Sequence, residues 1–246
     1  MTALIFEHPL NEKVRNYLRL EQLFEQLMLS KALQHPLQQQ QFFRTLFEVS
    51  EVLERCEWRT DLLKDLAKQA EKLDHWASMP NVDTSKIEEL LLQVKTLIAA
   101  ISKLHRVSDH LKDDRLLSSI RQRLCLPGGN CSFDLPYLHL WLHQPQERIN
   151  LQVQQWLGPF QIVAEAISHL LKLLREQHSD IQALAHKGFY QGVAADCGLL
   201  RIEVDTNYQC YPTVSGHKHR FAIKFISTSN QDIEDIPCTL YCCKIA

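Results

Sequence analysis

The sequence predicts an α+β protein with a mostly helical N-terminal part and a smaller antiparallel β-sheet. Apolar residues recur at helical spacing up to about residue 182, and after Ala183 the period changes to two. Three of the seven glycines precede residue 183, whereas four fall in the last 64 residues. No helical segment separates the successive strands, so the sheet is expected to be antiparallel.

Apolar residues three and four positions apart predict about six or seven helices. Pro9 suits the first turn of the first helix, which carries an apolar stripe over residues 14–28. A longer pattern over residues 42–76 forms one helix or two. The next helix covers residues 85–104.

Proline and glycine divide the rest of the helical part. A short helix opens at Asp113 or Asp114, and the turn Pro127-Gly128-Gly129-Asn130 ends it. The following helix is expected over about 134–156. The pair Gly158-Pro159 should separate it from a last helix over residues 160–175.

Alternation of apolar and polar residues predicts the strands. It is clearest over residues 200–205, returns over 221–225, and is weaker over 210–214 and 238–242. Residues 2–6 are a candidate additional strand of the same sheet. We therefore expect a helical domain over 1–182 and an antiparallel β-domain over 183–246.

Composition excludes several classes of protein. The 27 lysines and arginines against 29 aspartates and glutamates give a formal charge of −2, which argues against a dedicated nucleic-acid binder. No continuous apolar run reaches the 18 or so residues of a membrane span. Polar residues from Glu7 to Lys13 occupy the place of a secretory apolar segment, so we expect a cytoplasmic protein with reduced thiols.

The familiar catalytic and cofactor-binding motifs are missing from the sequence, so we expect neither an enzyme nor a bound cofactor. His139 and His143 lie four apart and are able to share a metal ion, but helix-surface histidines fit the spacing better. Four cysteines near the end lack the paired spacing of zinc knuckles, and packed thiols are the simpler interpretation. They are Cys210, Cys238, Cys242 and Cys243.

Local groups of positive charge are the most informative feature. Strand alternation over 215–225 sends Phe221 and its apolar neighbours to one face, and Lys218, Arg220 and Lys224 to the other. Arg220 and Lys224 should lie about 13 Å apart, which suits acidic or carbonyl groups along an extended peptide.

The helical part carries further arginines. Arg55 and Arg59 are four apart and share a helix face, while Arg115 and Arg123 differ by about 80° around theirs. The alternative interpretation of all these groups is a solvated surface with acidic neighbours.

Several dispersed motifs carry a resemblance to a known family. Near the start stands Phe6-Glu7-His8-Pro9-Leu10-Asn11-Glu12-Lys13, followed by Arg59-Thr60-Asp61-Leu62-Leu63-Lys64 and Arg121-Gln122-Arg123-Leu124. Ser132-Phe133-Asp134-Leu135-Pro136, Gly188-Phe189-Tyr190-Gln191 and Ser215-Gly216-His217-Lys218 continue the match. Over essentially the whole chain, these residues resemble the ZapD family of bacterial cell division proteins.

The resemblance implies a cytoplasmic, non-enzymatic homodimer at the midcell division ring. It would bind the C-terminal tail of the tubulin-like GTPase FtsZ and bundle FtsZ filaments. By similarity the tail-binding role comes to Arg220 and Lys224, with Arg55 and Arg115 as further candidates. The local charge pattern adds Arg59, Arg123 and Lys218. Lys224 stands where the family pattern has arginine. Lysine keeps the positive charge but cannot pair with a carboxylate in the bidentate way of a guanidinium.

Two other functions remain as alternatives at this point. One is a nucleic-acid binder that uses the same basic residues. The other is a metal-dependent enzyme that uses His139, His143 or the C-terminal thiols.

Overall fold

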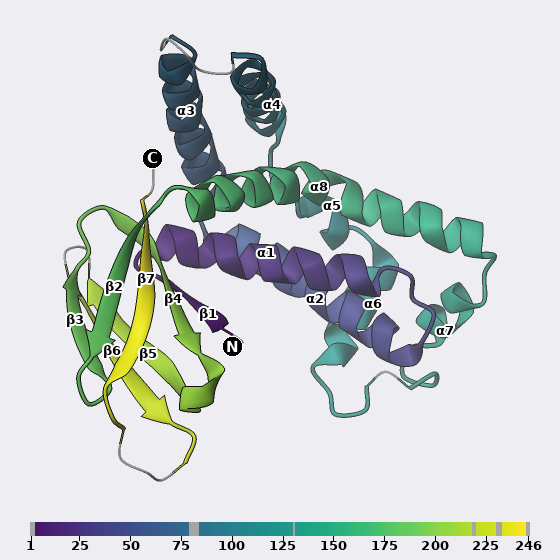
Figure 1. Ribbon diagram of the computed structural model, residues 1–246. Helices are drawn as coiled ribbons and strands as arrows, with labels where there is room; N and C mark the ends of the chain where they lie inside the picture. The colour runs from purple at the N-terminus through teal and green to yellow at the C-terminus, as the bar shows by residue number, and fades with distance from the viewer. Residues whose placement is uncertain (1–2, 79–83, 130, 218–219, 230–232, 245–246) are drawn as a thin grey trace. The chain divides into compact units, whose positions relative to one another are not determined.

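The computed structural model describes residues 3–78, 84–129, 131–217, 220–229 and 233–244 (Figure 1). By internal contacts, the chain divides into two compact units. One comprises residues 1–17 and 169–246 and contains the strands; we call it the β unit. The other, residues 18–168, is the helical unit. Each is described by itself.

The fold is α+β, as the sequence predicts. Within the described residues there are eight α-helices and two antiparallel sheets, together with a 3-10 turn at Thr206–Tyr208. The helices are α1 (Glu12–Ser30), α2 (Pro36–Arg55), α3 (Trp58–Ala77), α4 (Thr84–Lys103), α5 (Asp109–Lys112), α6 (Arg115–Leu124), α7 (Pro136–Leu142) and α8 (Gln146–Glu176). The strands are β1 (Ala3–Pro9), β2 (His178–Ala185), β3 (Phe189–Val193), β4 (Cys197–Asp205), β5 (Cys210–His217), β6 (Arg220–Ser227) and β7 (Ile236–Lys244).

The first helix begins later than Pro9 predicted. Pro9 is the last residue of β1, and α1 begins at Glu12. The side-chain oxygen of Asn11 accepts a hydrogen bond from the backbone N–H of Val14 at 2.8 Å. Asn11 therefore satisfies an N–H group that a helix start leaves unpaired, and this fixes where α1 begins.

The predicted helix break at Gly158-Pro159 is wrong. The chain breaks instead between α7 and α8, around Pro145, and α8 continues through Pro159 for 31 residues. Trp156, Phe160 and Val163 are all buried and stay in phase across the proline. An interior proline costs about 3 kcal/mol. Burying each of these large side chains contributes about 1.5–3 kcal/mol, so packing outweighs the lost hydrogen bond.

By length and composition, α8 is apolar enough to cross a membrane, and no other described helix is. Polar residues interrupt its apolar stretches, so no continuous apolar run marks this helix in the sequence. About 39% of its most apolar 18-residue window is buried within the structure. The core helix of a soluble protein meets the same criterion, so the finding is weak support for a membrane span.

Aromatic rings form the core of the helical unit. The rings of Phe42 and Phe43 on α2 lie 5.2 Å apart, and those of Trp141 and Trp156 lie 5.3 Å apart. Phe43 contacts both tryptophans edge-on, with centroid distances of 6.1 and 6.0 Å. Such pairs add to the free energy of burial and join α2, α7 and α8.

Asp114 connects α6 to this core. Its Oδ1 accepts the backbone N–H groups of Leu116 and Leu117, at 2.8 and 3.0 Å, as the N-cap of α6. Its Oδ2 accepts the indole N–H of the buried Trp156 at 2.9 Å. The predicted start of this helix at Asp113 or Asp114 is therefore confirmed, at Asp114.

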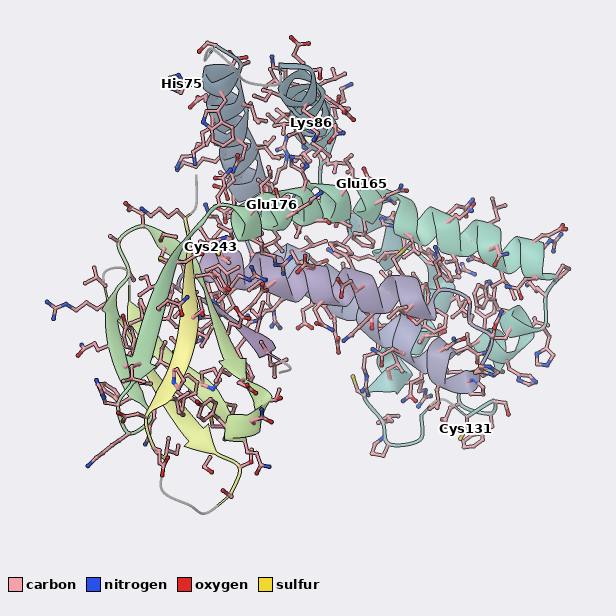
Figure 2. The ribbon with its side chains drawn as sticks, viewed as in Figure 1. His75, Lys86, Cys131, Glu165, Glu176 and Cys243 are labelled. Carbon is pink, nitrogen blue, oxygen red and sulfur yellow. The ribbon has the colours of Figure 1, made fainter. Side chains whose placement is uncertain are left out.

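Helices α3 and α4 pack side by side as a hairpin. His75 lies in the last turn of α3 and Lys86 in the first turn of α4, near the tip of the hairpin (Figure 2). The long sequence pattern over residues 42–76 thus covers two helices, α2 and α3, which separate at Cys56-Glu57.

The β unit is a sandwich of two sheets. The four-stranded sheet has the order β1-β4-β7-β2, and the three-stranded sheet has the order β3-β6-β5 (Figure 1). Leu200, Ile202 and Leu240 from the first sheet and Phe221, Ile223 and Phe225 from the second are buried together in one apolar cluster. The N-terminal β1 pairs antiparallel with β4, from Ala3 opposite Asp205 to Pro9 opposite Leu199.

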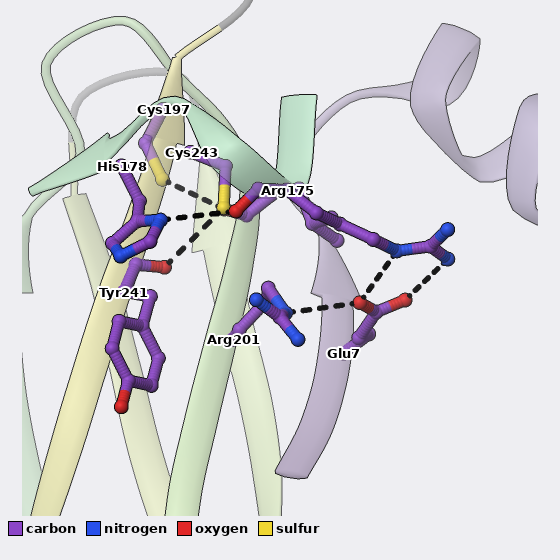
Figure 3. A network of polar contacts seen from close by, with 8 residues as sticks. Glu7, Arg175, His178, Cys197, Arg201, Tyr241 and Cys243 are labelled. Atoms are coloured by element: carbon purple, nitrogen blue, oxygen red, sulfur yellow. Dashed lines mark hydrogen bonds and ion pairs between the residues drawn. The ribbon is translucent and has the colours of Figure 1, made fainter. Parts of the chain in front are cut away.

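Glu7 holds β1 against its neighbours. Its carboxylate accepts two hydrogen bonds of 2.9 Å from the guanidinium of Arg175, and Nε of Arg201 lies 3.1 Å away as an ion pair (Figure 3). Arg201 also lies over the Tyr241 ring, whose hydroxyl donates to Glu203. That hydrogen bond raises the pKa of Tyr241. Local alternation alone does not reveal these partners.

Candidate functional site

The outer face of the three-stranded sheet carries two cations. Phe221, Ile223 and Phe225 of β6 are buried, whereas Arg220 and Lys224 are exposed, as the strand alternation predicts. Since β6 lies between β3 and β5, both cations stand in the middle of the sheet. Lys218 lies outside the described residues.

The strand register identifies the neighbours of the two cations. On β3, Phe189 lies opposite Lys224 and Val193 lies opposite Arg220. On β5, Thr213 lies opposite Lys224. We call the exposed side chains of this outer face the basic face. They are Arg220 and Lys224 on β6, Phe189, Gln191 and Val193 on β3, and Tyr211, Thr213 and Ser215 on β5.

The basic face differs electrostatically from the opposite sheet. The sequences of β3, β5 and β6 contain no aspartate or glutamate. Among the described residues, neither Arg220 nor Lys224 has an ion-pair partner, whereas Arg175 and Arg201 share Glu7. The charge of Arg220 and Lys224 is therefore available to an external anionic group.

The local sequence explains why β3 lies where it does. Gly188 has a φ of +74°, a conformation that favours glycine, and it precedes Phe189. Asp235 accepts the backbone N–H of Lys187 at 2.9 Å and pairs with His186 at 3.1 Å. The hydrogen bond from Lys187 lowers the pKa of Asp235 the most, and the contact with His186 lowers it further. The turn that delivers Phe189 to the face is thus fixed by a carboxylate.

Gly192 has a packing role on the inner side of β3. A Cβ atom at this position would lie 2.6 Å from the Phe221 ring. The absence of a side chain therefore lets Phe221 lie across β3 in the core, while its neighbour Arg220 faces outward.

In the helical unit, Arg55 and Arg115 lie at the same end of a helix pair. Phe43 of α2 lines a pocket of about 200 Å³ with Leu124, whereas Glu54 lines another with Leu117, so α2 and α6 run antiparallel. Arg55 ends α2, and Arg115 begins α6.

The two arginines differ in their contacts. Arg55 is exposed and pairs with Glu51 one turn earlier. Arg115 is exposed, directly after the Asp114 cap, with no ion-pair partner among the described residues. We infer that Arg115 is the more available of the two for an external anion.

Arg123 lies at the opposite end of α6. Eight residues separate it from Arg115, or about 12 Å along the helix axis. Its side chain is exposed, while Arg121 lies over the Phe47 ring at 5.2 Å. The structure therefore does not bring Arg123 together with Arg55 and Arg115 into one cluster.

Arg59 has a contact that its spacing did not reveal. Its guanidinium donates to the carbonyl oxygens of Ile101 and Ser102, at 3.3 and 2.5 Å. Both carbonyls belong to the last turn of α4, where a helix runs out of backbone N–H partners. The Ile101 carbonyl also accepts the backbone N–H of Leu104 at 3.0 Å, so Arg59 adds a second contact there. A cation is also favoured there by the helix dipole. We propose that Arg59 caps α4 and joins it to α3.

Replacing Arg59 with alanine should therefore affect stability rather than binding. We expect Arg59→Ala to lower the free energy of unfolding by about 1–2 kcal/mol, because two charge-assisted hydrogen bonds are lost. Urea denaturation followed by circular dichroism measures this change. Arg55→Ala, which removes an exposed surface pair, is the control and should cost less than about 0.5 kcal/mol. An equal loss of unfolding free energy in the two variants would contradict the capping role.

The structure offers little to a metal ion. Among the described residues, no three histidine, cysteine, aspartate or glutamate side chains gather at one point. The His139 and His143 rings lie 4.5 Å apart, and Nδ1 of His143 contacts the His139 carbonyl at 2.7 Å. This contact leaves Nε2 of His143 available to a ligand, but two histidines with no third ligand beside them in the described part of the chain are a weak metal site.

The cysteines are free thiols, and several are buried. Burial raises the pKa of Cys238 and of Cys243 to about 11. A hydrogen bond with Cys242, followed by burial, raises the pKa of Cys197. The same hydrogen bond lowers the pKa of Cys242. Protonated thiols are poor metal ligands and poor nucleophiles, so Cys197, Cys238 and Cys243 favour packing.

Phe189 and Val193 are the surface residues that the sequence analysis missed. The segment Phe189-Tyr190-Gln191-Gly192-Val193 alternates, but apolar side chains occur at both sets of positions. The local pattern therefore does not tell which set faces outward. Only the pairing with β6, which is distant in sequence, places Phe189 and Val193 beside the cations.

These features define a class of fold: an α+β protein whose β-sandwich presents a cationic face built from strands without aspartate or glutamate. The ZapD family model, described as a cell division protein, matches residues 18–224 of this chain. The chain is 41% identical over 245 residues to cell division protein ZapD of Shigella flexneri, covering 98% of this chain and 99% of the relative. Identity and coverage are the same for cell division protein ZapD of Escherichia coli O17:K52:H18 (strain UMN026 / ExPEC).

The chain belongs to the ZapD family, and this membership supports a role in cell division.

Proposed function

We propose that this protein binds the C-terminal tail of FtsZ through the basic face and cross-links FtsZ filaments in the cytoplasm at midcell. The observation that carries the proposal is the pair of exposed cations Arg220 and Lys224, which lie on strands without a carboxylate and have no ion-pair partner among the residues that the structure describes. The tail that the family recognises contains aspartates and apolar residues on a flexible linker. Cations beside apolar surface are complementary to such a peptide.

The cations of the helical unit form a second set of candidates within this proposal. Arg115 and Arg55 lie at one end of the α2–α6 pair, and Arg123 lies at the other. We assign Arg115 the larger contribution of the three, because Arg55 already pairs with Glu51. The protein acts by binding alone, with no catalytic step or cofactor.

Bundling adds a geometric requirement to binding. A protein with one tail site decorates a filament, whereas a cross-linker must offer sites to two filaments. A homodimer supplies two copies of the basic face. Each contact can then be weak, since the second forms at an effective concentration that reaches the millimolar range for a short flexible tether. Bundling should therefore depend more steeply on protein concentration than tail binding does.

The partner can be tested without changing this protein. FtsZ that lacks its C-terminal tail should still polymerise but should no longer sediment as bundles at low centrifugal speed. Full-length FtsZ under the same conditions is the control. Bundles that persist without the tail would move recognition to the filament body and contradict the proposal.

Ionic strength gives a second readout of the same interaction. Exposed charge pairs are screened over about 8–10 Å at 0.1–0.15 M salt, so tail affinity should fall as salt rises. A duplex DNA of random sequence, titrated at 0.15 M salt, serves as the anionic control. Tight binding to the DNA would favour the nucleic-acid alternative.

A further inference from the structure

We infer that Phe189 and Val193 form an apolar lane beside the two cations, so that the basic face selects extended peptides carrying apolar as well as acidic side chains. The inference rests on the proposed function and names the side chains that give it selectivity. Neither residue was a candidate from charge patterning.

The register places each apolar side chain next to one cation. Phe189 is directly opposite Lys224, and Val193 is directly opposite Arg220. Side chains of directly opposed residues share a face and have Cβ atoms about 4.5–5.5 Å apart. The sheet thus presents two rows, each with an apolar group on β3 and a cation on β6.

The row between them is small and uncharged. Gln191 lies opposite Ala222, which in turn lies opposite Ser215. The short Ala222 side chain stands in the centre of the sheet, between the two longer cationic side chains. A bound peptide therefore has space to run along the sheet from one row to the other.

Both apolar side chains of β3 are far more exposed than the inward-facing apolar residues of β6. Phe189 is 51% exposed and Val193 is 69% exposed, whereas Phe221, Ile223 and Phe225 are almost completely buried. A single exposed apolar residue needs no explanation. What carries the inference is their position. Each lies opposite a cation that has no ion-pair partner within the described part of the chain, on strands whose sequences contain no aspartate or glutamate.

The dimensions of the face favour an extended peptide. The two rows are four residues apart along the strands, or about 13 Å. A single carboxylate or phosphate group reaches only one row. An extended segment of about five residues reaches both rows. It directs alternate side chains toward the cations of β6 and toward the apolar side chains of β3. Acidic side chains would then meet the cations while apolar ones cover Phe189 and Val193.

Contacts with the cations and contacts with the apolar lane respond differently to salt. Contacts with Arg220 and Lys224 are screened, whereas burial of apolar surface is not weakened by added salt. Loss of the apolar lane should therefore remove the part of the affinity that persists at high salt. A merely structural role of Phe189 or Val193 would not produce this signature.

The experiment compares two peptides and two double variants by fluorescence anisotropy, using the full-length protein. One labelled peptide is the FtsZ C-terminal tail, and the other is the same tail with its apolar residues replaced by serine and its aspartates kept. The test variant is Phe189→Thr with Val193→Thr, in which threonine preserves β propensity. The control is Phe133→Thr with Leu92→Thr, which removes two exposed apolar side chains from the helical unit.

We expect the test variant to bind the natural tail roughly 25-fold more weakly, a factor of about five for each residue, and the control to change by less than about twofold. The serine-substituted peptide should bind the wild-type protein as weakly as the natural tail binds the test variant. At 0.5 M salt, the wild-type protein should retain measurable binding of the natural tail that the test variant lacks.

Two results separate failure of this inference from failure of the proposed function. Equal affinity of the wild-type protein for both peptides, together with unchanged binding by the folded test variant, would overturn the inference and leave tail binding intact. Absence of any binding of the natural tail to the wild-type protein would overturn the proposed function and the inference with it.

Discussion

Reversing both charges of the basic face, in Arg220→Glu with Lys224→Glu, is expected to weaken binding of the FtsZ tail about a hundredfold and to abolish filament bundling. Each exposed cation–carboxylate contact contributes up to about 1 kcal/mol, and reversal replaces it with a repulsion of similar size. Two reversed contacts therefore remove about 3 kcal/mol, which corresponds to the stated factor. Fluorescence anisotropy of a labelled tail peptide and low-speed sedimentation of FtsZ filaments measure the two effects.

The control for this experiment matches the change in net charge. Lys86 and Lys95 lie exposed on α4, away from the basic face in sequence, and Lys86→Glu with Lys95→Glu introduces the same four units of negative charge (Figure 2). If the control variant weakens binding of the tail peptide as strongly as the test variant does, long-range electrostatics governs recognition and the basic face does not. If folded test protein still bundles filaments, the site assignment fails.

Local periodicity was sufficient for features that one segment determines by itself. The alternation around Arg220 requires only that Phe221, Ile223 and Phe225 enter a core. The contrast of helical and two-residue periods similarly predicts an α+β fold, and the structure confirms it. In these cases the amphipathic pattern and the packing specify the same arrangement.

Features that depend on a distant partner were not visible in the sequence. Pro159 looks like a helix break, but buried aromatic residues on both sides of it keep α8 continuous. Arg59 looks like a free surface charge, but it contacts the end of α4, more than forty residues away. Phe189 becomes a neighbour of Lys224 only through the pairing of β3 with β6. Sequence spacing predicts the face of an element, whereas these contacts depend on which elements meet.

Removing the carboxylate of Asp114 is expected to be among the most destabilising single substitutions in the helical unit. Asp114→Ala should lower the free energy of unfolding by about 3 kcal/mol. Loss of the N-cap contributes about 1 kcal/mol. The unpaired indole N–H of Trp156, which is 3% exposed, adds about 1–3 kcal/mol. For a chain of this length, such a change lowers the melting temperature by about 8 °C, which scanning calorimetry can measure.

The neighbouring Asp113 supplies a matched control. It is exposed and is the C-cap residue that follows α5. Asp113→Ala therefore removes the same group one residue earlier and should lower the free energy of unfolding by less than about 0.5 kcal/mol. Asp114→Asn should fall between the two, because its amide oxygen still caps α6 while its amide nitrogen is a poor partner for the Trp156 N–H. If Asp114→Ala is no more destabilising than Asp113→Ala, water must replace the carboxylate at both contacts. In that case Asp114 does not hold α6 and α8 together.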